Sequence, residues 1–317
     1  MKIVKAELLW SRQCPHQCNG CGMKKPLAYT DEKWAELDLG KWERGFAELR
    51  NLGCEFVAIY GAEPLERMAG LPNVVRCILA KGMQTSIITS VYSPEKVQVL
   101  VKAGLSSITT SYDGQGSHKS RKLKALNGLE LLDGYSVRDK AAVITASRRN
   151  QEYLAQTVDE IIARGHWCHF DIMHPGQLFG KCLGTEPLPL RGYLHKMLDR
   201  LEYHAKAGGT VPLSSAWFEV LRNNYDPRDV RKTWHCSHER EVGWVTIDWD
   251  GTVYPCDDFQ VPYPRKLWEG IDWDRFEAWR TEVIKTCPGC AWSTHFEAAR
   301  IARDGDLGKY LHNMLED

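Results

Sequence analysis

Short apolar runs alternate with amphipathic segments through the first half of the chain. Residues 3–10 alternate loosely and predict a first strand, and residues 38–52 carry apolar positions at spacings of three and four, which predicts a helix. The same alternation continues, with glycines after most of the helices. The later strands are expected at 54–60, 84–90, 106–111, 140–146 and 166–173, and the later helices at 71–81, 94–103, 121–132 and 152–164.

Strands that alternate with helices predict a parallel sheet whose strands are joined by right-handed crossovers. Polar or glycine-containing turns follow the predicted strands at 61–64, 89–90, 111–113, 147–149 and 173–175. In a barrel these turns converge on one rim, where active sites lie, whereas an open sheet spreads them along an edge. We therefore predict an α/β fold with a partial (β/α)6 TIM-like barrel over residues 1–180.

The character of the chain changes after this region. Residues 180–189 are rich in Gly and Pro, and helices are expected at 190–205 and 215–223. From about residue 232 Cys, Trp and Asp become dense, long periodic helices stop, and residues 245–254 predict a hairpin around Asp250-Gly251. The predicted organisation is a barrel at 1–180, a helical connector at 181–232 and a small domain at 233–317.

Composition narrows the classes of function. Lys plus Arg and Asp plus Glu are 41 each in the 317 residues, so no basic field favours nucleic acid or an anionic membrane. No apolar stretch approaches eighteen residues, and the charged start does not look like a signal peptide, so we expect a cytoplasmic protein. In that reducing compartment the eleven Cys indicate metal ligands and free thiols rather than disulfides.

Cys14, Cys18 and Cys21 have the spacing C-x3-C-x2-C. Thiolates this close can share one metal centre, and three ligands leave a fourth position open, as a catalytic metal needs. A zinc knuckle is the alternative. It requires a fourth ligand nearby, and only His16 is available, at an awkward position inside the loop.

A second group of thiols lies in the C-terminal region, at Cys236, Cys256, Cys287 and Cys290. Single Cys on either side of a hairpin, followed by a distant C-x2-C, predict a compact four-thiolate cage. A full set of four suits either a closed iron–sulfur cluster or structural zinc. His235 and His238 keep a Cys3His zinc site open as well.

The first spacing resembles the signature of the radical S-adenosylmethionine (radical SAM) enzymes. In that family the three Cys hold a [4Fe–4S] cluster, whose fourth iron binds the amino and carboxylate groups of S-adenosylmethionine (SAM). The tail is similar to the twitch domain, the short form of the SPASM extension, in which four Cys hold one auxiliary [4Fe–4S] cluster. The resemblance implies a partial barrel followed by a small iron–sulfur domain, with an electron donor such as flavodoxin or ferredoxin as partner.

The resemblance also implies cofactor-binding residues. Gly61-Ala62-Glu63-Pro64 is similar to the family's Gly-Gly-Glu-Pro, whose backbone binds the methionyl amino group, and Ala62 departs from it. An Ala is tolerated there only if the position does not need a positive φ. The other family positions are the ribose or carboxylate contacts Thr89 and Ser111, the adenine-packing Met173, and Gly20, which replaces an aromatic residue and leaves only a backbone contact.

In the family a 5′-deoxyadenosyl radical takes a hydrogen atom from the substrate. The net reaction is an oxidation if an auxiliary cluster accepts the next electron, and an epimerisation if a thiol returns a hydrogen atom. Cys182, in the connector near the expected barrel mouth, is the candidate hydrogen donor. Buried thiols behave as small apolar groups, which is the expectation for Cys54, Cys77 and Cys168. The candidate proton acceptors are Asp171, Asp257 and Asp258.

Three functions compete. The first is oxidation or epimerisation of a small polar substrate such as a sugar, an aminocyclitol or a nucleotide-like molecule. It is favoured because the first strand begins at residue 3, with no peptide-recognition domain before it, and because the tail is short. The second is maturation of a ribosomally made peptide by the same chemistry. The third is a non-catalytic iron–sulfur electron carrier.

Overall fold

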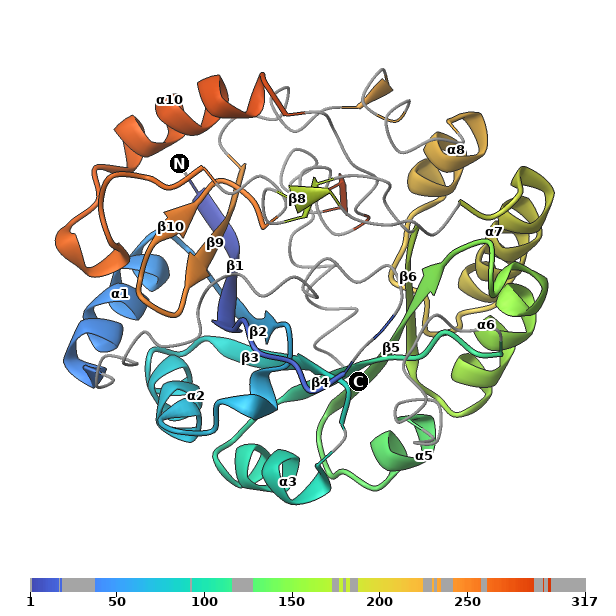
Figure 1. Cartoon of the computed structure of the whole chain (residues 1–317), viewed down its shortest axis with the longest axis horizontal. Coiled ribbons are helices and arrows are strands. Elements are labelled where there is room, and N and C mark those ends of the chain that lie inside the picture. Colours follow the sequence, from blue (N-terminus) through green and yellow to red (C-terminus); the bar gives the residue numbers. More distant parts are fainter. Residues whose placement is uncertain are drawn as a thin grey trace.

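An eight-stranded sheet forms the centre of the protein (Figure 1). The structure is a computed structural model. It describes residues 2–16, 18, 38–91, 93–115, 128–172, 177–178, 181–182, 188–224, 230, 233–234, 242–257, 261–287, 293 and 296–297. Among these residues, no helix is both long and apolar enough to cross a membrane.

Seven of the eight strands are parallel, and only β10 is antiparallel to its neighbour. The sheet order is β10-β9-β1-β2-β3-β4-β5-β6. This arrangement confirms the parallel α/β fold expected from the alternation of strands and helices. The strands are β1 (Lys2–Ser11), β2 (Phe56–Gly61), β3 (Gln84–Thr89), β4 (Ser107–Ser111), β5 (Asp139–Ala146), β6 (Trp167–Ile172), β9 (Val242–Asp248) and β10 (Val253–Tyr254). A separate antiparallel pair consists of β7 (Gln177–Leu178) and β8 (Lys181–Cys182).

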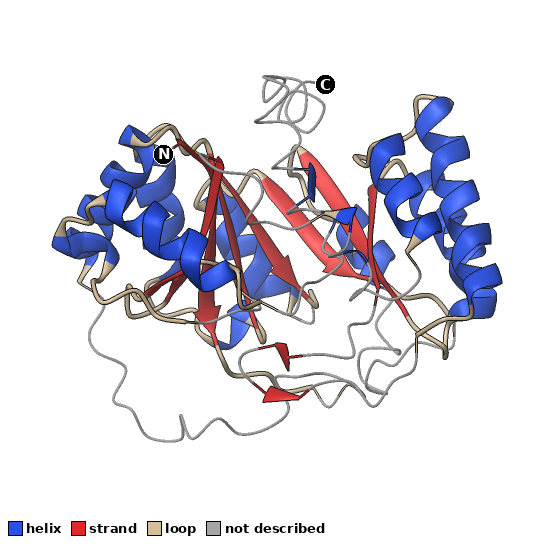
Figure 2. Ribbon diagram, turned by 90° about the horizontal axis from the view of Figure 1, so that it is seen from above, coloured by secondary structure: helices blue, strands red, loops and turns tan. Residues whose placement is uncertain are grey.

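Helices surround the outer face of the curved sheet (Figures 1 and 2). The α-helices are α1 (Leu39–Asn51), α2 (Leu71–Ala80), α3 (Pro94–Lys102), α5 (Gly128–Asp133), α6 (Leu154–Ala163), α7 (Arg191–Lys206), α8 (Ser215–Asn223) and α10 (Trp273–Ile284). Short 3-10 turns form η2 (Pro64–Glu66), η3 (Gln151–Tyr153) and η5 (Leu267–Glu269). Of the helix predicted at 121–132, residues 121–127 lie outside the described part.

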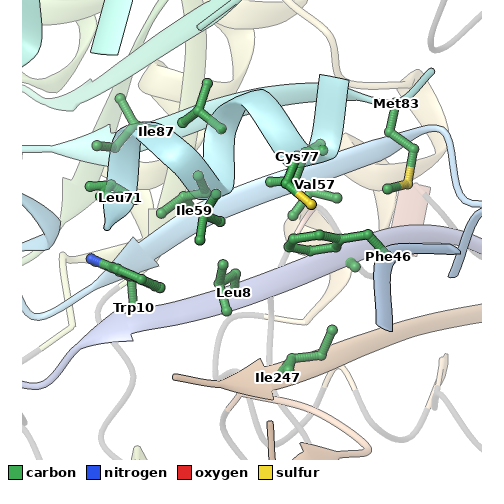
Figure 3. Packing of buried hydrophobic residues seen from close by; sticks show 14 of the residues in the cluster. Leu8, Trp10, Phe46, Val57, Ile59, Leu71, Cys77, Met83, Ile87 and Ile247 are labelled. Carbon is green, nitrogen blue, oxygen red and sulfur yellow. The ribbon is translucent and has the colours of Figure 1, made fainter. Parts of the chain in front are cut away.

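The hydrophobic core lies between the strands and these helices. Near β1–β3, outward-facing side chains such as Leu8, Ile59 and Ile87 pack with Phe46 of α1 (Figure 3). A second apolar layer joins β5 and β6 to α6, α7 and α8. Because side chains alternate across a strand, the positions between these apolar residues face the inside of the barrel.

The C-terminal region contributes to the same sheet. The predicted hairpin is present as β9 and β10, with Val253 opposite Ile247, and β9 pairs in parallel with β1. The domain boundaries expected at 180 and 232 stay a prediction. The expectation that long helices stop after residue 232 is wrong, because α10 has 12 residues, and the side chain of Asp272 caps it by accepting from the amide of Arg275.

Candidate functional site

The carboxyl ends of β1, β2 and β3 lie side by side and support the candidate site. The loop with the first three Cys begins directly after β1. The Cys14 thiol is exposed, the Cys18 thiol is partly exposed, and neither is in a disulfide. Cluster ligands require accessible thiols that are not in disulfides. The third predicted ligand, Cys21, lies outside the described residues.

The turn after β2 lies very close to the end of β1. Gly61 has φ +152°, and a Cβ at this position would lie 2.2 Å from the carbonyl oxygen of Ser11. The next amide, that of Ala62, donates to the same oxygen at 2.8 Å. Ala62 is not among the described residues with a positive φ, so this position accepts Ala where the family has Gly.

Glu63 joins this turn to the end of β3. Its side chain is buried, and both carboxylate oxygens accept hydrogen bonds from the protein. Oε1 accepts from the hydroxyl of Thr89 at 2.5 Å and from the amide of Leu65 at 3.1 Å. Oε2 accepts from the amide and the hydroxyl of Ser90 at 2.9 and 2.6 Å. The Glu63 carboxylate therefore braces the two turns against each other.

The loop that carries the first three Cys, called the cluster loop below, joins the hydrogen-bond network of Glu63 through His16. This side chain is buried, and its Nε2 lies 3.1 Å from the hydroxyl oxygen of Ser90. Sequence reasoning treated His16 only as an awkward zinc ligand and did not identify Ser90. No local pattern indicated the contact, because the two residues are 74 positions apart.

Two buried guanidinium groups lie at the carboxyl ends of β1 and β9. Arg12 forms an ion pair with Asp248 at the end of β9, and both side chains are at most 6% exposed. Arg67 lies between the rings of Trp10 and Trp249, with its guanidinium carbon 4.8 and 4.9 Å from the two centroids. Burial lowers the pKa of Arg67 to about 10, and the Asp248 carboxylate opposes this shift. Sequence reasoning missed these cations.

The inner face of the barrel is polar. Lys5 and Glu7 of β1 form an ion pair at 2.8 Å. On the opposite side, β6 places His169 and Asp171 at alternate positions that face inward. Burial raises the pKa of Asp171 to about 8, with a further contribution from the Asp257 carboxylate. Burial lowers the pKa of His169 to about 4, with a further contribution from the Lys5 ammonium.

Several other predicted residues are placed by the structure. Ser111 is the last residue of β4 and Cys182 the last of β8, Cys256 is buried after β10, and Cys287 follows α10. The Cys256 thiol donates to Oδ1 of Asp257 at 3.4 Å. The buried positions of Cys54, Cys77 and Cys168 confirm that they pack as small apolar groups. The predicted residues outside the described part are Gly20, Cys21, Met173, Cys236, Asp258 and Cys290, with the alternative ligands His235 and His238.

The described residues fit an iron–sulfur cluster with SAM at this rim. No group of three candidate metal ligands is complete within the described ranges, since three of the seven predicted Cys lie beyond them. The two described thiols of the first motif are accessible. The turn at Gly61 and Ala62 contacts the end of β1, from which the loop with these thiols begins, and Glu63 joins this turn to the end of β3.

Comparison with known proteins agrees with this fold. The model of the radical SAM superfamily matches residues 8–127. The native structure of anSMEcpe with bound AdoMet superposes with a TM-score of 0.62 over 98% of this chain and all of that one, at 12% identity. Streptococcus suis SuiB bound to S-adenosylmethionine gives a TM-score of 0.60 over 87% of this chain and 66% of that one, at 15% identity.

The segment that matches the radical SAM superfamily contains the three-Cys loop and the Gly61–Pro64 turn. The two solved structures, at 12 and 15% identity, share the fold of this chain.

Two curated relatives also match part of the chain. The PqqA peptide cyclase of Methylobacterium nodulans is 27% identical over 122 residues, which are 38% of this chain and 31% of the relative. The PqqA peptide cyclase of Methylocella silvestris is 32% identical over 103 residues, which are 32% of this chain and 26% of the relative. The matches thus span about a quarter to a third of the length of these relatives.

The Gly61 turn is testable by adding one methyl group. We expect Gly61→Ala to destabilise the apoprotein by at least about 1–3 kcal/mol, because φ is unfavourable and the new Cβ meets the Ser11 carbonyl. Urea unfolding measures this change. Ala62→Gly is the control and should change stability by less than about 1 kcal/mol. Equal stabilities of the wild-type protein and Gly61→Ala would contradict the described turn.

The buried carboxyl group of Asp171 should make the stability of the apoprotein depend on pH. Its folded pKa of about 8 lies above the unfolded value, so the folded state binds the proton more tightly. The stability contributed by this proton is present at acidic pH and lost as pH rises from about 4 to 8. Relative to Asp171→Asn, the wild-type apoprotein should lose up to about 1.4 kcal/mol of unfolding free energy per pH unit in this window. Urea unfolding at several pH values measures the slope, and parallel curves would count against the buried carboxyl.

Proposed function

We propose that this chain is a radical SAM enzyme that modifies a ribosomally made peptide. The observation that carries the proposal is the match of about a third of the chain to PqqA peptide cyclases. The matched parts cover only a fraction of those proteins, so the peptide substrate is inferred from their names and not from a shared substrate-binding region.

The expectation of a small polar substrate is corrected by the same finding. The relatives act on a peptide, whereas that expectation named a sugar, an aminocyclitol or a nucleotide-like molecule. It depended on the absence of a preceding domain and on a short tail, and neither feature measures the size of a binding site. The match of residues 8–127 to the radical SAM superfamily also favours an enzyme over a non-catalytic electron carrier.

The residues of the rim would hold the cofactors. Cys14, Cys18 and Cys21 would hold the first cluster, and the backbone at 61–64 would lie along the methionyl end of SAM. The remaining cofactor contacts would come from Gly20, Thr89, Ser111 and Met173. When bound, the cluster and SAM supply hydrogen-atom abstraction from the substrate. The protein positions the reacting groups and excludes water from them.

A second cluster in a twitch-type region would make the reaction an oxidation. Its proposed ligands are Cys236, Cys256, Cys287 and Cys290. Two observations support the proposal: neither Cys256 nor Cys287 is in a disulfide, and β9 brings this part of the chain alongside β1. We further propose a flavodoxin or ferredoxin as the electron donor and the reducing cytoplasm as the location, since both suit oxygen-sensitive clusters.

The inner face would receive the reacting side chain of the peptide. Forming a cross-link by oxidation removes two protons and two electrons in total. One proton and one electron would leave together as the abstracted hydrogen atom, the second electron would go to the second cluster, and the second proton would go to an acceptor. Asp171 is a suitable acceptor because a pKa of about 8 lets it exchange a proton near neutral pH. Cys182 would matter only if a thiol returned a hydrogen atom, as epimerisation requires.

Cysteine variants test the proposed function. Air-free reconstituted protein is mixed with SAM, dithionite and a precursor peptide, and 5′-deoxyadenosine and the peptide mass are measured. We expect Cys14→Ala to abolish both deoxyadenosine and product. Cys256→Ala should still form deoxyadenosine but lose at least about tenfold of the cross-linked peptide, which is lighter by two hydrogens.

The control is Cys54→Ala, which removes a buried thiol away from the rim and should retain product in the folded fraction. Product from a sugar or nucleotide library, with no response to any peptide, would contradict the peptide substrate. Full activity of Cys256→Ala would contradict the second cluster.

A further inference from the structure

His16 is placed by the fold at the junction of three loops that the proposed function uses. It lies between Cys14 and Cys18, and its ring contacts Ser90 at the end of β3. Ser90 in turn contacts Glu63, which lies in the turn after β2. The loop that carries the thiols and the turn proposed to bind the methionyl group are thus connected by side chains.

The direction of each hydrogen bond follows from the donors available. The Ser90 hydroxyl has one hydrogen, and it donates to the Glu63 carboxylate at 2.6 Å. Toward His16 the same oxygen is therefore the acceptor, so Nε2 of His16 carries a hydrogen and donates to it at 3.1 Å. This nitrogen is occupied by the contact and is not available as a metal ligand.

The backbone at the end of β3 is held in an uncommon conformation beside this contact. Val91 has φ +48°, a left-handed value that is costly for a β-branched residue, and it is fully buried. Its amide donates to the hydroxyl of Thr89 at 3.2 Å, and that hydroxyl donates to Glu63. The Glu63 carboxylate therefore stabilises a strained turn that aims the Ser90 hydroxyl at His16.

We propose that His16 is a positioning residue that couples the cluster loop, through Ser90 and Glu63, to the turn that binds the methionyl end of SAM. This inference rests on SAM binding at the rim and does not depend on the peptide substrate. Loss of the contact should leave the thiols able to bind iron but allow the cluster loop and the 61–64 turn to move independently. SAM would then meet a less well-ordered site.

SAM binding to the loaded but unreduced protein tests the coupling without any turnover. Equilibrium dialysis with labelled SAM gives the dissociation constant, and iron content is measured on the same samples. We expect His16→Ala to weaken SAM binding about tenfold at unchanged iron content, since one buried hydrogen bond contributes about this much. Ser90→Ala should weaken SAM binding at least as much, because it also removes the hydroxyl contact with Glu63. The double variant should be no weaker than Ser90→Ala, because both substitutions break the same chain of contacts.

Two further variants separate positioning from general damage. His16→Gln offers an amide N–H to Ser90 and should recover SAM binding to within about threefold of wild type. Ser93→Ala removes a nearby exposed hydroxyl, which contacts Glu95, and should leave SAM affinity unchanged. Unchanged SAM affinity in His16→Ala, or additive losses in the double variant, would overturn the proposal.

If a variant fails to bind iron, the coupling can still be tested on its apoprotein by hydrogen exchange. Hydrogen exchange of residues 61–66 and 89–91 is then compared with that of the wild-type apoprotein. Faster exchange at both segments in His16→Ala supports the coupling, and unchanged exchange at both overturns it. Because none of these measurements uses a substrate, a negative result here differs from a failure of the peptide hypothesis.

Discussion

The buried carboxylate of Glu63 is the interaction on which the candidate site depends. A charge that is 1% exposed is costly unless hydrogen-bond donors replace the water it loses. Four donors do so, one from its own turn and three from the end of β3. The ends of two neighbouring strands are thereby locked together, and the strained backbone at Val91 is part of this arrangement.

The sheet separates an apolar environment on its outer face from a polar environment on its inner face, and the candidate site needs both. Its outer face packs against helices and carries the apolar core, while its inner face carries ionisable groups. Charged groups inside are neutralised locally, as in the pairs Lys5–Glu7 and Arg12–Asp248. The second pair also connects the two ends of the chain, because Arg12 follows β1 and Asp248 ends β9. The cluster loop is therefore supported by the C-terminal region as well as by the barrel strands.

The sequence predicted the strands and most helices closely because alternation and terminal glycines are local signals. It missed α10, whose buried residues are Phe276, Ile284 and Arg280, and a hydrophobic pattern counts an arginine as exposed. It placed the Cys loop and the 61–64 turn at one rim, since parallel strands bring their carboxyl ends together. The contacts of His16, Ser90, Arg12 and Arg67 depend on residues distant in sequence, so no local pattern indicated them. The predicted class of substrate was wrong, because the lack of a recognition domain before the first strand does not define the size of a binding site.

The most direct test of the central claim is the Mössbauer spectrum of protein reconstituted with 57Fe, recorded with and without SAM. The account predicts [4Fe–4S] clusters of two kinds, and SAM should change the signal of a single iron in one of them. The second cluster, held by four thiolates, should be unaffected. A chain that binds no iron–sulfur cluster, or a spectrum that SAM leaves unchanged, would contradict the account.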